Sequence, residues 1–226
     1  MAVIRPFRAV RPVKEVAHLV ASVPYDVVNK EESAELAKGN PISFLRVTRS
    51  EIEITEKVNP YSPEVYQKAK ENYKRLKEEA PLIQEDKPCL YVYKLIMGEQ
   101  EQVGIAATFA VDDYDNDVIK KHEKTRKEKE DDRTNHIVTT EAQTGAVFLT
   151  YKDVEKVDVL VNKTMAENEP LYEFTANDVI KHILWVMPEK FEENIIKEIG
   201  KVKYLYIADG HHRAASASRA RKVKQE

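Results

Sequence analysis

The fold of this chain is decided near its carboxyl end by residues 204–213, which read Tyr-Leu-Tyr-Ile-Ala-Asp-Gly-His-His-Arg. The first five of these residues form a short apolar run, which is typical of a buried strand. The alanines that follow Arg213 favour a helix, and Asp209-Gly210 between the two segments is a turn signal. The sequence therefore predicts a strand, a tight turn and the amino terminus of a helix.

The predicted turn carries groups that suit phosphate. The amino terminus of a helix leaves backbone N–H groups unpaired and has a partial positive charge, so phosphate binds there readily. Gly210 lets an anion approach the backbone, and Asp209 is placed to hold Mg²⁺ or to orient a hydroxyl group. His211, His212 and Arg213 add ring donors and a guanidinium fork. We therefore predict a phosphate-binding turn.

Two other interpretations of the paired histidines remain open. The rings can cap the helix and pack against their neighbours without binding any ligand. A zinc site needs further ligands at suitable spacing. Such ligands are not evident, because Cys89 is the single cysteine and His122, His136 and His182 are scattered along the chain.

Composition argues against several classes of partner. The 226 residues contain 36 Lys and Arg against 39 Asp and Glu, for a net charge of -3, which gives no general attraction to nucleic acid or to acidic membranes. The single cysteine forms no disulfide within the chain, and no run of about 18 apolar residues suggests a membrane span. We expect a globular, cytoplasmic protein that binds small molecules, with no nucleic acid and no membrane partner.

Periodicity along the chain predicts both helices and strands. The clearest helix covers residues 63–79, where apolar side chains recur at steps of three and four after Pro63. Two runs rich in Val, Tyr and Ile form a hairpin through residues 97–100. The expected fold class is α+β, with a mixed, largely antiparallel sheet and flanking helices. The other expected helices are 13–20, 30–38, 152–167, 188–202 and 214–224, and the expected strands are 7–12, 43–48, 89–96, 102–111, 145–151, 182–187 and 204–208.

Two regions are expected along the chain, with a soft boundary near Pro81. Residues 1–80 form an N-terminal α/β segment, and residues 81–226 form a sheet-containing region with the phosphate-binding turn. The last helix ends without a cap and is basic, with Arg219, Arg221, Lys222 and Lys224. We expect the natural protein to continue beyond this end.

A dense cluster of charge covers residues 120–133, with seven Lys or Arg and five Asp or Glu. One interpretation is a solvated helix or loop. The other is a binding surface for a polyphosphate, with one of two carboxylates, Glu123 or Asp132, as a base or a Mg²⁺ ligand. The basic side chains of this second interpretation are His122, Arg126, Lys129 and Arg133.

Four blocks of the sequence resemble the domain of unknown function 1015 family, in that family's order. The blocks are Pro24-Tyr25-Asp26-Val27-Val28, Asn40-Pro41 with Ser43-Phe44-Leu45, His122-Glu123 with Thr125-Arg126, and residues 209–213. The last block is also similar to the phosphate-binding motif of the ParB and sulfiredoxin superfamily. That superfamily includes kinases that phosphorylate free L-serine from a nucleotide or pyrophosphate, so the resemblance implies a ParB/sulfiredoxin-like core and serine kinase activity.

The resemblance also implies roles for individual residues. Gly210, His211, His212 and Arg213 would hold the donor phosphates, and Asp209 would contact the metal or the substrate hydroxyl. Asp26 and Glu123 are the candidates for the base, and Tyr25 and Ser43 lie in matching blocks as substrate contacts. The chain departs from the family at residues 127–130, which are wholly charged here where the family often has prolines.

The leading expectation is a small-molecule kinase with Mg²⁺ as its cofactor, acting on free L-serine. A second hypothesis is a nucleotide-responsive, ParB-like binding module, in which the same turn binds phosphate and the response is conformational. A third is a structural fragment whose substrate pocket is completed by residues absent from this sequence.

Overall fold

The chain divides into two units, each assembled from three separate segments. Unit 1 contains residues 1–18, 83–120 and 149–206, and unit 2 contains residues 19–82, 121–148 and 207–226. The computed structural model describes residues 1–54, 58–79 and 82–225. The expected boundary near Pro81 lies outside the described residues, and the division into residues 1–80 and 81–226 stays a prediction.

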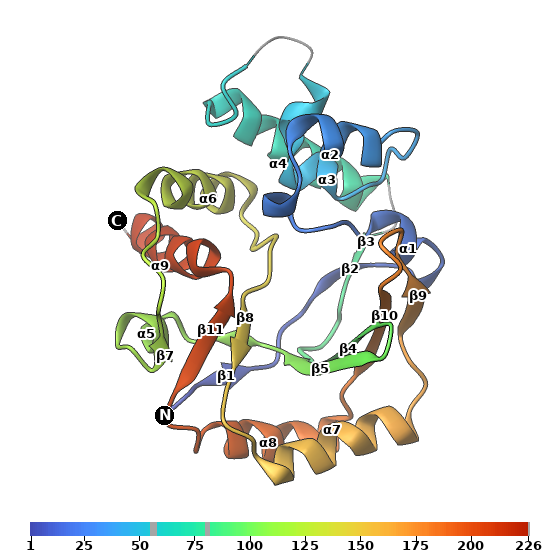
Figure 1. Cartoon of the computed structure of the whole chain (residues 1–226), viewed down its shortest axis with the longest axis vertical. Helices are drawn as coiled ribbons and strands as arrows, with labels where there is room; N and C mark the ends of the chain where they lie inside the picture. Colours follow the sequence, from blue (N-terminus) through green and yellow to red (C-terminus); the bar gives the residue numbers. More distant parts are fainter. Residues whose placement is uncertain (55–57, 80–81, 226) are drawn as a thin grey trace. The chain divides into compact units, whose positions relative to one another are not determined.

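Unit 1 is built on a four-stranded antiparallel sheet with the strand order β5-β4-β10-β9 (Figure 1). The strands β4 (Tyr91–Met97) and β5 (Gln100–Ala106) form the predicted hairpin, whose turn contains Gly98 at φ +60°. The strand β10 (Lys181–Val186) pairs with β4 on one side and with β9 (Tyr172–Thr175) on the other. Alternate residues of β4 and β10 therefore face a common core.

One helix packs against this sheet, and a second helix packs on the first (Figure 1). The helix α7 (Glu155–Glu167) packs on β4 and β10, and α8 (Glu189–Ile199) packs on α7. Apolar residues of α8 repeat at helical spacing, and Ile195 and Ile199 are buried because they face the core. The expected helices at residues 152–167 and 188–202 are confirmed, each slightly shorter than predicted.

The remaining strands of the described residues form small sheets. The pairs β1-β6 and β2-β3 are two-stranded, and β7, β11 and β8 form a three-stranded sheet in which β7 and β11 are parallel. Together with the main sheet they make an α+β fold whose sheets are mostly antiparallel, as predicted. The bounds are β1 Ile4–Arg5, β2 Val10–Pro12, β3 Leu82–Gln84, β6 Thr108–Phe109, β7 Ile119–Lys120, β8 Phe148–Thr150 and β11 Leu205–Asp209; the short helices of this part are η1 Lys14–Val16, α1 Ala17–Val20 and α5 Val111–Asp115.

Unit 2 is largely helical. Its apolar core centres on Val47 and Leu76, which are fully buried, and partly buried apolar side chains pack against them. The predicted helix after Pro63 is confirmed as α4, and the predicted helix near residue 30 begins with a capping box at Asn29. Its elements are η2 Tyr25–Val27, α2 Lys30–Leu36, α3 Leu45–Thr48, η3 Ser50–Glu53, α4 Pro63–Glu78, α6 Lys127–Thr140 and α9 His211–Gln225. None of the helices in the described ranges has the length and apolar character needed to cross a membrane.

The predicted strand at residues 43–48 is wrong, because Leu45–Thr48 forms the helical turn α3 and no residue of the segment is in a strand. The backbone N–H of Thr48 bonds to the carbonyl of Phe44, which is the spacing of an α-helix. The apolar residues that suggested a strand are nevertheless buried, with Leu45 at 2% and Val47 at 0% exposure. Packing against α4 decides the conformation here, and the local β preference of this short apolar run does not.

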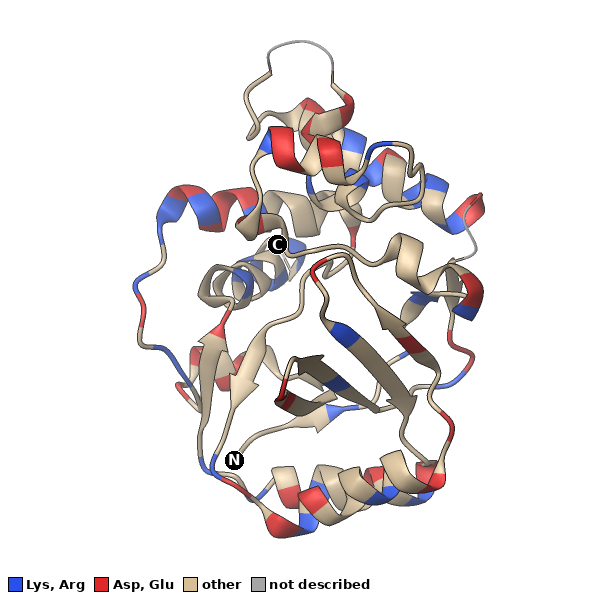
Figure 2. Cartoon of the chain, turned by 45° about the vertical axis from the view of Figure 1, so that its right-hand side comes forward, with Lys and Arg blue, Asp and Glu red and all other residues tan. Residues whose placement is uncertain are grey.

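Other predicted strands are shorter than expected. Residues 102–111 are divided between β5, β6 and the start of α5, and only residues 148–150 of the segment 145–151 are extended. Within residues 7–12, Val10–Pro12 forms a strand and Phe7 makes an isolated bridge to Cys89. The charged cluster at residues 120–133 begins at the end of β7 and continues into the first half of α6. Basic and acidic residues alternate along the start of this helix (Figure 2).

Candidate functional site

The turn after β11 has the predicted geometry of a strand, a tight turn and a helix start. Asp209 ends β11, Gly210 has φ +90°, and α9 begins at His211. The backbone N–H of Ala214 donates to the Gly210 carbonyl at 2.9 Å, which is the first hydrogen bond of the helix. The N–H groups of the first turn therefore have no partner within the helix, as at any helix start.

Arg213 ties this turn to two other segments of unit 2. Its Nη2 donates to Asp209 Oδ2 at 2.6 Å and to Asp26 Oδ2 at 3.2 Å, and its Nη1 donates to the carbonyl of Ala146. The side chain is packed beside two glycines. A Cβ at Gly145 would lie 3.1 Å from Arg213 Cδ, and one at Gly210 would lie 3.3 Å from Arg213 Cζ. Both positions therefore favour glycine because the guanidinium occupies the adjacent space.

The charges around Arg213 leave an excess of negative charge. Burial lowers the pKa of Arg213, but Asp26 and Asp209 more than offset this effect and raise it, so the guanidinium is always charged. The side chains of Asp26 and Asp209 are 41% and 63% exposed. Within the described residues, their recorded bonds use only Oδ2 of each carboxylate. Two accessible carboxylates therefore share a single cation.

His211 forms a second cluster with the loop before α6. Its Nδ1 lies 3.3 Å from Glu123 Oε2, and its ring meets His122 edge to face with 4.4 Å between centroids. Burial lowers the pKa of His211, and the neighbouring His122 lowers it further. Glu123 acts in the opposite direction but does not cancel these effects. The ring is therefore neutral near neutral pH. Its Nε2 is buried and has no hydrogen-bond partner among the described residues.

His212 links the start of α9 to the start of α6. Its Nε2 accepts a hydrogen bond from the backbone N–H of Arg126 at 3.1 Å, so this nitrogen carries a lone pair. Arg126 is the N-cap residue of α6. The predicted role of Arg126 involved its side chain, whereas the contact recorded in the structure comes from its backbone.

The two helices joined by His212 run in the same direction. Ser216 Oγ donates to the Glu130 carbonyl at 3.1 Å, and Lys224 Nζ lies 3.4 Å from Glu141 Oε1. These contacts follow the same order along α6 and α9, so the amino termini of the two helices lie together. Each terminus carries a partial charge of about +0.5, and the two add at this place.

Tyr25, on the turn η2, is held by a buried polar network. The guanidinium of Arg133 lies over its ring at 4.1 Å, and Arg133 Nε donates to Asp132 Oδ2 at 2.8 Å. Tyr66 donates its hydroxyl hydrogen to the other oxygen of Asp132 at 3.1 Å. Burial raises the pKa of Tyr25, which keeps its hydroxyl protonated. The network fixes the turn that carries Asp26.

Two predicted site residues have their recorded contacts elsewhere. Lys129 Nζ donates a hydrogen bond to the hydroxyl of Tyr61 at 2.8 Å and not to a residue of the turn. Ser43 is 4% exposed, and its recorded backbone bonds go to Asn40 and Arg46. The structure therefore brings together Asp26, Asp209 and Arg213, then His122, Glu123 and His211, and then Arg126 and His212, while Lys129 and Ser43 are bonded to other partners.

Sequence reasoning missed three contributors to the site. Gly145 makes room for Arg213, the Ala146 carbonyl accepts from it, and Tyr66 supports Asp132. For the first two, the only local signal was a glycine as the first residue of the predicted strand 145–151. Tyr66 was recognised as part of the apolar face of a helix, and nothing local indicated that its hydroxyl had a polar partner.

The metal-binding capacity of the site lies in its carboxylates. Among the described residues, no group of three or more His, Cys, Asp or Glu side chains is placed to hold a metal ion. A structural zinc site, which needs four ligands, does not fit this arrangement. Mg²⁺ is commonly bound by one or two carboxylates with water and substrate phosphates as its other ligands. Asp26 and Asp209 fit that mode.

Comparison with known proteins gives one result. A family model described as "Protein of unknown function (DUF1015)" matches residues 4–226. The chain belongs to this family. A search of curated proteins and a search of solved structures each found no match. The DUF1015 assignment confirms the resemblance based on the four sequence blocks, and the relation to the ParB and sulfiredoxin superfamily stays a prediction.

Proposed function

We propose that this chain is a phosphotransferase that uses Mg²⁺ and transfers a phosphoryl group from a nucleotide or pyrophosphate to the hydroxyl of free L-serine. The observation that carries the proposal is that Asp26 and Asp209 share one nitrogen of Arg213 directly beside the first turn of α9. Enzymes of phosphoryl transfer mainly position the reactants and offset charge. Accessible carboxylates for Mg²⁺ beside N–H donors for phosphate suit both tasks.

The choice of L-serine rests on the resemblance of residues 209–213 to the motif of the ParB and sulfiredoxin superfamily. On the same basis, the strand β11, Gly210 and the helix α9 are the phosphate-binding core of that superfamily. The parallel helices α6 and α9 support this assignment, because their combined positive end attracts a polyanion. No Walker-type sequence is needed for such a site.

The donor phosphates are bound by the first turn of α9. Backbone N–H groups of residues 211–213 would bind the donor together with Nδ1 of His212, whose Nε2 is already bonded to Arg126, while Arg213 keeps the two carboxylates in place. Asp209 would hold the Mg²⁺ ion that accompanies the donor, which leaves Asp26 available as a base. When bound, Mg²⁺ supplies positive charge that offsets the charge of the transferred group.

The transfer itself is an exchange of one P–O bond for another. The L-serine hydroxyl gives its proton to a carboxylate, its oxygen bonds to phosphorus, and the bond between phosphorus and the leaving oxygen breaks. Asp26 is the first candidate for this base because it lies in the same cluster as Asp209. Glu123 is the second, since its side chain is 58% exposed and is held by His211.

The direct test is formation of phosphoserine from L-serine and Mg²⁺, with ATP, ADP or pyrophosphate as the donor. The proposal expects product with at least one donor and loss of turnover in His212→Ala, with an unchanged circular dichroism spectrum. Unchanged turnover in that variant would remove the turn from the mechanism. Donor binding by calorimetry without any product would favour the nucleotide-responsive binding module instead.

A further inference from the structure

Arg133 is an arginine with one edge held by the protein and one edge without a recorded partner. Its Nε donates to Asp132 Oδ2 at 2.8 Å, and the side chain is 12% exposed. Its guanidinium lies 4.1 Å from the centroid of the Tyr25 ring, so one flat face is covered as well. Within the described residues, no hydrogen bond is recorded from Nη1 or Nη2. The free edge is the part that can bind a ligand.

The support beneath Arg133 is rigid. Asp132 is 5% exposed, and both of its carboxylate oxygens are in use, one with Arg133 and the other with the Tyr66 hydroxyl. Asp132 therefore cannot turn to cover the two Nη groups. A guanidinium fixed through Nε and through its face presents two parallel N–H donors at a set angle, and a carboxylate fits such a fork with both oxygens.

Arg133 also lies close to the proposed reaction site. Tyr25 precedes Asp26, whose Oδ2 lies 3.2 Å from Arg213 Nη2. Arg133 lies over the ring of Tyr25, and Arg213 bonds to the next residue, Asp26, so both guanidinium groups lie at one short turn. Asp132 offsets the charge of Arg133, so the free edge attracts a highly charged donor less strongly than the paired helix termini do. Its two N–H donors still fit one singly charged carboxylate.

We propose that Arg133, supported by Asp132 and Tyr25, binds the α-carboxylate of the acceptor. The acceptor class is then a hydroxy amino acid and not a simple alcohol. This inference rests on the proposed phosphotransferase function and adds the residue that selects the substrate. Tyr25, predicted as a substrate contact, acts here as the platform on which the guanidinium lies.

The test compares L-serine with 2-aminoethanol, which is L-serine without its carboxylate. A charge-assisted hydrogen bond contributes about 1.5–3 kcal/mol, so the wild type should prefer L-serine in kcat/KM by about 10- to 150-fold. Arg133→Gln should lose this preference by raising the KM for L-serine, with little change for 2-aminoethanol and for the donor. Arg133→Lys, which keeps the charge without the fork, should retain part of the preference.

A matched control is Arg46→Lys, at an arginine of unit 2 whose three guanidinium nitrogens all have recorded partners within the chain. Its preference for L-serine should equal that of the wild type. A merely structural role for Arg133 would lower kcat with both acceptors alike. Equal use of the two acceptors by the wild type, an unchanged preference in Arg133→Gln, or a rise in the donor KM alone would overturn the inference.

Failure of the inference and failure of the proposed function have different signatures. If the wild type phosphorylates L-serine and Arg133→Gln keeps its KM, the inference fails and the function stands. If no acceptor is phosphorylated, the role of Arg133 is tested by calorimetry of L-serine binding. Binding that is lost in Arg133→Gln supports the inference without the enzyme activity, and absent or unchanged binding overturns it. If Arg133→Gln does not fold, carboxylate binding by Arg133 is tested with Arg133→Lys and with the two acceptors in the wild type.

Discussion

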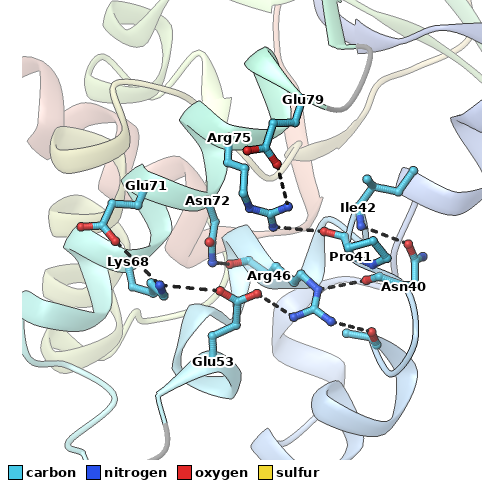
Figure 3. A network of polar contacts seen from close by, with 11 residues as sticks. Asn40, Pro41, Ile42, Arg46, Glu53, Lys68, Glu71, Asn72, Arg75 and Glu79 are labelled. Carbon is cyan, nitrogen blue, oxygen red and sulfur yellow. Dashed lines mark hydrogen bonds and ion pairs between the residues drawn. The ribbon is translucent and has the colours of Figure 1, made fainter.

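Arg46 and Arg213 each anchor a network of unit 2, but the two networks differ in how completely they are satisfied. Arg46 bonds through every guanidinium nitrogen, with Nε to the Asn40 carbonyl at 2.9 Å, Nη1 to Glu53 Oε1 at 2.6 Å and Nη2 to the Ala37 carbonyl at 2.9 Å (Figure 3). Arg213 uses both Nη atoms, whereas its Nε is buried without a partner in the described chain.

The acceptors differ in the same way. Glu53, the carboxylate beside Arg46, has a side chain that is 19% exposed, and Lys68 approaches its second oxygen at 3.9 Å. Asp209, the carboxylate beside Arg213, is 63% exposed. A network closed by the chain itself stabilises the fold. A network with accessible carboxylates beside a helix start can still bind a ligand. The network of Arg213 is therefore the better candidate for a functional site.

The neighbours of Arg46 show what a closed network holds together. Asn72 Nδ2 donates to the Arg46 carbonyl at 2.7 Å, and Arg75 Nη2 donates to the Pro41 carbonyl at 3.0 Å (Figure 3). These bonds connect the end of α2, the turn α3 and the helix α4 around the apolar core. All three guanidinium nitrogens of Arg46 are bonded within the described part of the chain, so we assign this region a structural role.

The largest effect is expected for Asp209→Asn. Turnover should fall by about 1,000-fold because the variant loses a carboxylate that holds Mg²⁺. The matched control is Glu53→Gln, which makes the same carboxylate-to-amide change beside another arginine at the same separation of 2.6 Å. Steady-state kinetics of both variants check the comparison, and equal losses in the two would erase the distinction between the networks.

Arg46→Ala should have the next largest effect, on stability. Removing the guanidinium leaves Glu53 and two backbone carbonyls without their partner, which should cost about 3 kcal/mol of the free energy of unfolding. Urea denaturation measures this loss, while the KM for L-serine should stay within twofold of the wild type. A stable variant with a raised KM would place Arg46 in the binding site and contradict the comparison.

His136 gives a pH dependence that belongs to the structural side. It is 3% exposed, its Nε2 lies 3.0 Å from the Val47 carbonyl, and burial lowers its pKa from 6.5 to about 4. Below pH 6.5 the unfolded chain therefore takes up a proton that the folded chain does not. Stability is highest above pH 6.5 and falls as the pH decreases toward 4.

The expected loss is about 2 kcal/mol between pH 7 and pH 5. His136→Gln keeps a hydrogen-bond donor but does not titrate in this range, so its unfolding free energy should depend less on pH. Urea titrations at the two pH values measure the difference. The same pH dependence in wild type and variant would show that another group is responsible.

The smallest effect is expected for Lys129→Ala. The sequence suggested Lys129 as a phosphate contact, but its ammonium group bonds to the Tyr61 hydroxyl and lies near that ring. An exposed contact of this kind contributes less than about 1 kcal/mol. The donor KM should therefore change by less than about threefold, and a tenfold increase would restore the original prediction for this residue.

The sequence predicted those parts of the site that lie close together along the chain. An apolar run, Asp209-Gly210 and an alanine-rich segment specify the strand, turn and helix through local preferences alone. The partners of Arg213 are a different case, since Asp26 and Ala146 come from distant segments. Their proximity depends on the packing of several helices, which no local pattern contains.

The same limit explains the error at residues 43–48. Leu45 and Val47 belong to the apolar run that suggested a strand, and both side chains are buried. Their conformation follows from the packing against Leu76 and from the network of Arg46, so it was not available from a six-residue apolar run. The helical form of residues 127–133 was also ambiguous, because alternating charge suits a solvated helix and a loop equally well.

The most direct test of the account is calorimetric titration with pyrophosphate, with and without Mg²⁺, of wild type, Asp209→Asn and Glu53→Gln. The account predicts that Mg²⁺ strengthens pyrophosphate binding to the wild type and to Glu53→Gln, and that this effect is lost in Asp209→Asn. Equal dependence on Mg²⁺ in all three proteins, or no binding to any of them, would contradict the claim that the turn at Asp209 binds the phosphate donor.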